Sequence, residues 1–92
     1  MDSLSSVVAY INVLSASAEA TSRAEDRPRY ESHLASAARL VALLVGDAPS
    51  DDVQRWFRQE DRAFGWGYLS GKAGQAAEEA FARLKQQIDR DY

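Results

Sequence analysis

The sequence predicts an all-α fold, a single domain in which four helices pack as an antiparallel bundle. Apolar residues recur every three or four positions along most of the 92 residues. Proline and glycine stand mainly between these periodic segments, where they interrupt helices. No stretch alternates apolar and polar residues as a half-buried strand does. We therefore expect helices at about 3–23, 28–45, 51–64 and 71–90.

The first predicted helix has one apolar face. Its stripe is Leu4, Val7, Ile11, Leu14 and Ala18, which follow a 3-4-3-4 spacing. Asp2 or Ser3 can accept a hydrogen bond from the first free amides and so cap the helix. The second half of this segment is small and polar, so we expect it to pack weakly.

The second predicted helix starts at Pro28, a residue tolerated in a first helical turn. Asp26 precedes it as a candidate N-cap. The run 40–45, LVALLV, has no polar side. Such a run predicts burial against more than one neighbour, so we expect this helix to be the central one. Gly46 follows, and glycine commonly ends a helix in the left-handed conformation.

The third predicted helix has Ser50 as its candidate N-cap. Val53, Trp56 and Phe57 share one face and are expected in the core. A glycine-rich turn then leads to the fourth helix. Its apolar positions are Ala73, Ala77, Ala80, Phe81, Leu84 and Ile88.

The composition excludes several classes of function. There is no cysteine, which excludes disulfides and thiolate metal sites. The net charge of −3 argues against binding along phosphate backbones. No apolar run approaches the roughly 20 residues that span a bilayer. Asp2 stands where a signal peptide would carry Lys or Arg, so we expect a cytoplasmic protein without a membrane role.

The sequence offers no set of residues for catalysis. His33 is the only histidine, and a general base or metal ligand needs partners at suitable spacing. We expect it to be packed or solvated. The adjacent acidic pairs Asp51-Asp52, Glu60-Asp61 and Glu78-Glu79 diverge by about 100° on a helix, so neither member of a pair converges with the other on a substrate. We expect no enzyme, no metal and no cofactor.

The segment 56–74 gathers aromatic residues and glycines and is the candidate binding region. Trp66 and Tyr68 stand between glycines, where they either fold back onto the core or face a partner. Tyrosine, tryptophan and arginine are enriched at binding hot spots. Acidic residues lie nearby, and an acidic rim suits a basic partner. The candidate contact residues are Trp66, Tyr68, Asp51, Asp52, Glu60 and Asp61.

This half of the chain, VQRWFRQEDRAFGWGYLSGKAGQAAEEAFARLK, consists of a helix, an aromatic-glycine turn and a second amphipathic helix. In that arrangement it resembles small bacterial immunity and inhibitor proteins of the helical-bundle type. The resemblance implies a cytosolic protein that binds and blocks a toxin domain from a neighbouring cell. Such toxins are often basic nucleases, which an acidic inhibitor would complement.

Two alternatives remain open at the level of sequence. A helix-turn-helix regulator would use Ala42, Gly46 and the following helix, with Arg55, Arg58 and Arg62 facing DNA. Against this, Asp52 stands near a position where such motifs need an apolar residue. The other alternative is self-association of the bundle through apolar residues left exposed. The candidates for that contact are Val8, Val13 and Val45.

Overall fold

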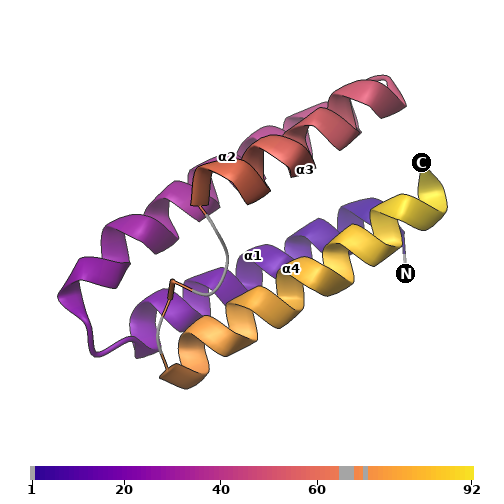
Figure 1. The fold of residues 1–92 in the computed structure, drawn as a ribbon. Helices are drawn as coiled ribbons and strands as arrows, with labels where there is room; N and C mark the ends of the chain where they lie inside the picture. Colours follow the sequence, from indigo (N-terminus) through magenta and orange to yellow (C-terminus); the bar gives the residue numbers. More distant parts are fainter. Residues whose placement is uncertain (1, 65–67, 70) are drawn as a thin grey trace.

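The computed structural model describes residues 2–64, 68–69 and 71–92, and within these ranges the fold is all-α with no strand, as predicted. Its helices are α1 (Ser3–Ala20), α2 (Arg27–Val45), α3 (Ser50–Phe64) and α4 (Gly71–Asp91), and a short 3₁₀ turn, η1 (Ala24–Asp26), precedes α2. The helices run up and down in alternation (Figure 1). The two chain ends lie at the same end of the bundle.

The start of α1 follows the capping prediction, whereas its end and the start of α2 differ from expectation. The Asp2 side chain accepts a 2.7 Å hydrogen bond from the amide of Ser5. Helix α1 ends at Ala20 because Thr21 is extended, three residues before the predicted end. Asp26 is not the N-cap we expected: it has helical dihedral angles, makes no side-chain cap bond and is fully buried. The 3₁₀ turn passes directly into α2 and replaces the cap.

The turn between α2 and α3 also corrects two expectations. Gly46 has φ −84°, and the left-handed residue is Asp47, with φ 51°. Aspartate is one of the few non-glycine residues that adopt this conformation readily. Ser50 is the first residue of α3, and its hydroxyl donates to the carbonyl of Tyr92 at 3.2 Å instead of capping α3.

Helix α1, and not α2 as the sequence suggested, lies against both of its neighbours most closely. Small residues permit this approach to α4: Gly74, Ala77 and Ala80 are buried, and the Ser17 hydroxyl donates to the Ala73 carbonyl at 3.0 Å. A Cβ on Gly74 would stand 2.4 Å from the carbonyl oxygen of Leu69, so this position requires glycine.

Aromatic rings fill the space between α3 and the rest of the bundle. Trp56 and Phe57 are buried, as predicted, and both lie against Phe81 of α4, with ring centroids 6.3 and 5.6 Å apart. Tyr10 of α1 reaches the same cluster, 5.9 Å from Phe81. Large rings separate α3 from α4, which explains why their backbones approach less closely than those of α1 and α4. None of the described helices has the length and apolarity needed to cross a membrane.

Candidate functional site

A chain of hydrogen bonds connects α2, α3 and the segment before α4, and we call its four residues the polar cluster: His33, Ser36, Glu60 and Tyr68. His33 Nδ1 lies 2.7 Å from Glu60 Oε1, and His33 Nε2 lies 2.6 Å from the Tyr68 hydroxyl. The Ser36 hydroxyl donates to the other carboxylate oxygen of Glu60. His33 is fully buried and Glu60 is 2% exposed.

The Glu60 carboxylate determines the direction of its bond to His33. An ionised carboxylate only accepts hydrogen bonds, so Nδ1 of His33 donates to Glu60. In the neutral tautomer that donates from Nδ1, Nε2 is an acceptor, and the Tyr68 hydroxyl is the donor within reach. Glu60 thus receives two donors from α2. Two such bonds offset part of the cost of burying a carboxylate.

The structure therefore places Glu60 inside the bundle and not on the acidic rim where the sequence interpretation put it. One signal in the sequence points to this position. Glu60 follows Val53 by seven residues and Trp56 and Phe57 by four and three, so it shares the apolar face of α3. His33 likewise falls on the face of Tyr30 and Ala37, one turn away on either side. An acidic residue on a core-facing stripe indicates a hydrogen-bond donor on the facing helix.

Trp56 adds a further hydrogen bond between α2 and α3. Trp56 Nε1 donates to the carbonyl of Ser36 at 2.8 Å. Ser36 therefore bonds to α3 twice, through its hydroxyl to Glu60 and through its carbonyl to Trp56. These contacts fix the rotation of α2 against α3.

Tyr68 is half-buried, and its hydroxyl belongs to the polar cluster. The Arg29 guanidinium lies over the Tyr68 ring at 5.0 Å from the centroid, and Arg29 also bonds to Asp26 at 3.3 Å. Burial raises the pKa of Tyr68 to about 12, with Glu60 adding to the rise and Arg29 opposing it. The hydroxyl is therefore protonated at neutral pH and available as a donor to His33.

The remaining predicted contact residues do not gather in one place. Asp51 is exposed, Asp52 pairs with Arg55 at 3.3 Å, and Asp61 pairs with Lys85 at 3.8 Å. Asp51 and Asp61 are ten residues apart, or about 15 Å along the axis of α3. Trp66 lies outside the described residues.

The geometry of α2 and α3 differs from that of a helix-turn-helix. In that motif the two helices cross at about 90–120°. Here α2 and α3 run side by side in opposite directions (Figure 1). Arg55, Arg58 and Arg62 are exposed on α3, but the exposed acidic residues of the same helix balance their charge. The arrangement does not favour the DNA-binding alternative.

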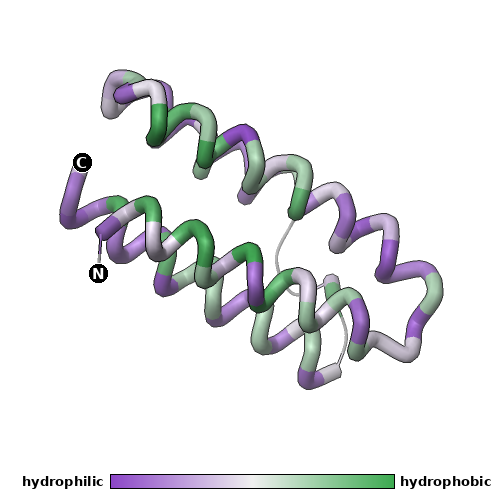
Figure 2. Tube along the Cα trace, turned by 180° about the vertical axis from the view of Figure 1, so that it is seen from behind, coloured by the Kyte–Doolittle hydropathy of each residue, from purple (hydrophilic) through white to green (hydrophobic). Residues whose placement is uncertain are grey.

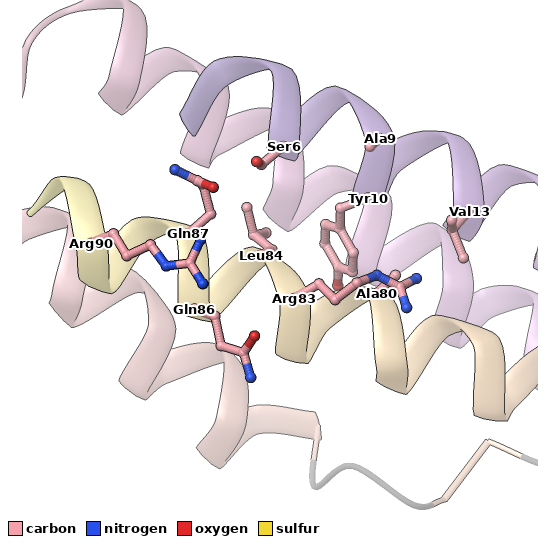
Figure 3. A pocket seen from close by; sticks show the side chains of 10 residues that line it. All are labelled: Ser6, Ala9, Tyr10, Val13, Ala80, Arg83, Leu84, Gln86, Gln87 and Arg90. Atoms are coloured by element: carbon pink, nitrogen blue, oxygen red, sulfur yellow. The ribbon is translucent and has the colours of Figure 1, made fainter. Parts of the chain in front are cut away.

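Two surface pockets lie along the α1–α4 groove. The first has a volume of about 300 Å³, with Tyr10 and Leu84 in its wall and Arg83 and Arg90 beside its mouth (Figure 3). The second pocket lies farther along the groove, where Ala20 at the end of α1 and Lys72 at the start of α4 line it. Neither pocket is lined by a residue of the polar cluster, so neither brings a substrate to His33. The described residues contain no group of three or more ligands that would hold a metal ion.

Apolar side chains are also exposed outside the α1–α4 groove, on α1 and at the end of α2. Leu4 is 42% exposed, Val8 48% and Val45 of α2 66%. Val13, the third residue predicted for self-association, is half-buried and lines both pockets of the α1–α4 groove.

Comparisons of the chain with protein-family models, curated proteins and solved structures gave no match. The side chains offer three features that bear on function: a buried polar cluster that holds Tyr68, a mixed-charge helix α3, and exposed apolar residues on α1 and α2.

Proposed function

We propose that this chain is a protein-binding module, an immunity or inhibitor protein that binds and neutralises a bacterial toxin domain. The observation that carries the proposal is the ordered Tyr68–Arg29 pair. The Tyr68 hydroxyl is bonded to His33 at 2.6 Å and the ring is covered on one side by Arg29. A tyrosine and an arginine that are held in place lose little conformational entropy when a partner binds.

The charge of the chain supports a basic partner. The net charge is −3, and Asp51, Asp52 and Asp61 all lie on α3 with at least part of each side chain accessible. Charge of this sign steers a basic domain, such as a nuclease, toward the inhibitor and speeds their association. The proposal involves no catalytic step, and it places the protein in the cytoplasm, where an incoming toxin would be met.

A rescue experiment tests the proposal. Toxic C-terminal domains of secreted proteins encoded beside the gene are expressed in a bacterial host with and without this chain. We expect one domain to stop growth alone and to be tolerated, and co-purified, when the chain is present. If no neighbouring domain is toxic, or toxicity is unchanged by the chain, the proposal is wrong.

Matched charge reversals then locate the binding surface. Asp51→Lys on α3 and Glu79→Lys on α4 each change the net charge from −3 to −1 at an exposed site. We expect Asp51→Lys to weaken binding about tenfold, the effect of roughly 1.4 kcal/mol, and Glu79→Lys to weaken it much less. Equal effects of the two changes would show that only overall charge matters and would reject α3 as the contact surface.

A further inference from the structure

The outward side of the α1–α2 pair is nearly free of charge along 3–18 of α1 and 34–45 of α2. No charged residue occurs in 3–18, and Arg39 is the only one in 34–46. At the chain average of 27% charged residues, these two segments would hold about eight. Charge is instead concentrated in η1, the start of α2, α3 and α4. Figure 2 shows hydrophobic residues gathered along α1 and the C-terminal half of α2.

The rotation of both helices shows that their exposed apolar residues share this side. Ser17 of α1 bonds to α4, and Ser36 of α2 bonds to α3. Val8 precedes Ser17 by nine residues, and Val45 follows Ser36 by nine. Nine residues at about 100° each place a side chain half a turn away. Val8 therefore points away from α4, and Val45 points away from α3.

We call this surface the α1–α2 face. It consists of Leu4, Val8 and Ile11 on α1 and of Leu34, Ala38, Val41 and Val45 on α2. Ile11, Leu34 and Val41 are half-buried and pack against the core, whereas Leu4, Val8, Ala38 and Val45 are exposed. The members recur at i, i+4 and i+7 on each helix, so each set forms a stripe along its helix.

The run 40–45 shows that no described helix covers this face. Its apolar residues surround the helix, which predicts burial on more than one side. Leu40 and Leu44 enter the core and Leu43 is half-buried, but Val45 is 66% exposed. The described helices of one copy therefore cover only part of the surface that this run presents.

We propose that the α1–α2 face is the site at which two copies of this chain associate about a two-fold axis. A two-fold interface brings a surface against itself, so the surface must be complementary to itself. An apolar face without charge meets this condition because no like charges are brought together. A basic toxin domain finds no carboxylate to pair with on this face. Association of two copies through this face is therefore independent of the proposed inhibitor function.

The small area of the face indicates a weak association. The uncharged part of α1 is about 24 Å long, and two packed helices are about 20 Å wide. Each copy thus contributes roughly 400–500 Å², and the pair buries about 900 Å² in total, which is less than the roughly 1,000 Å² of a stable interface and is the size of a weak, transient one. We expect a reversible dimer with a dissociation constant on the order of 10–100 µM.

Sedimentation velocity of the full chain tests the proposal over about 1 µM to 1 mM, the range that brackets this affinity. We expect the mass to rise from monomer to dimer with concentration. Val8→Glu and Val45→Glu place a charge in the face and should raise the dissociation constant at least tenfold. Ala82→Glu makes a comparable change at an exposed position of α4 and should leave it within about twofold of the unchanged chain. Circular dichroism checks that each variant is folded.

Backbone amide shifts of the unsubstituted chain provide a second measurement that needs no variant. We expect shifts that depend on concentration in α1 and α2 and constant shifts in α3 and α4. A chain that stays monomeric at 1 mM overturns the proposal, as does a dimer that Ala82→Glu weakens as strongly as Val45→Glu. A monomer whose Val8 and Val45 are needed to bind another protein or lipid vesicles also overturns it, because the face then belongs to that partner.

Discussion

Removal of the buried carboxylate in Glu60→Ala is the sharpest test of the structure. The change leaves the Nδ1–H of His33 and the hydroxyl of Ser36 without their acceptor in a site that water does not reach. Each buried donor that is left without an acceptor costs about 1–3 kcal/mol, so the two donors together cost about 2–6 kcal/mol. A chain of this length has a free energy of unfolding of roughly 5–14 kcal/mol. The substitution is therefore expected to remove a large part of it.

Glu60→Gln provides the matched control because it keeps the shape and removes the charge. The amide oxygen accepts from one donor, the His33 ring can exchange its tautomer, and the Ser36 hydroxyl can rotate. We therefore expect a loss of only about 1–2 kcal/mol. Urea unfolding followed by circular dichroism at 222 nm measures both variants, and the slope with urea shows whether the native state has remained compact.

The same experiment distinguishes the structure from the interpretation of the sequence alone. A glutamate on a solvated helix face changes stability by less than about 0.5 kcal/mol when replaced with alanine. If Glu60→Ala falls in that range, the polar cluster does not stabilise the fold and the argument for an ordered Tyr68 fails with it. A double-mutant cycle with Ser36→Ala, in which the two losses are not additive, would identify the bond directly.

The remaining predictions concern Tyr68, the glycine on α4 and alkaline pH. Tyr68→Phe removes the donor to His33, and we expect a loss of about 1 kcal/mol in urea titrations, with faster amide exchange at Leu69; unchanged exchange would contradict the bond. Gly74→Ala raises helix propensity but places a Cβ 2.4 Å from the Leu69 carbonyl, so we expect it to destabilise by about 1–3 kcal/mol; a gain in stability would contradict this packing. Burial raises the pKa values of Tyr10, Tyr30 and Tyr68 above 10, the last to about 12. The folded chain then holds these protons more tightly than the unfolded chain, so this stability is present below pH 10 and is lost as the pH rises toward 12; a constant urea midpoint over that range would refute it.

The binding hypothesis and the polar cluster are linked through one residue. The sequence predicts that Tyr68 either folds back onto the core or faces a partner, and the structure shows a half-buried Tyr68 whose hydroxyl bonds to His33. A substitution there acts on stability and on binding together. Tyr68→Phe is therefore the appropriate variant in a binding assay, because it retains the ring that a partner would contact. The more drastic Tyr68→Ala would remove both roles at once.

The secondary structure could be predicted from the sequence. The spacing of apolar residues determined the number and approximate extent of the helices, and Asp2 identified the first cap, because both signals depend on residues within one or two turns. The same spacing placed Trp56 and Phe57 in the core. The uncharged composition of α1 and of the second half of α2 is also visible directly in the sequence.

What each helix faces was decided only by the tertiary structure. Glu60 and His33 are 27 residues apart, and their contact depends on the rotation and register of α2 against α3, which no local pattern specifies. For the same reason α1 proved to be the most closely packed helix although the run 40–45 looked more apolar. Small residues at the α1–α4 contact and large rings at the α3–α4 contact set the distances between helices. The resulting helix arrangement buries Leu40 and Leu44 and leaves Val8 and Val45 exposed.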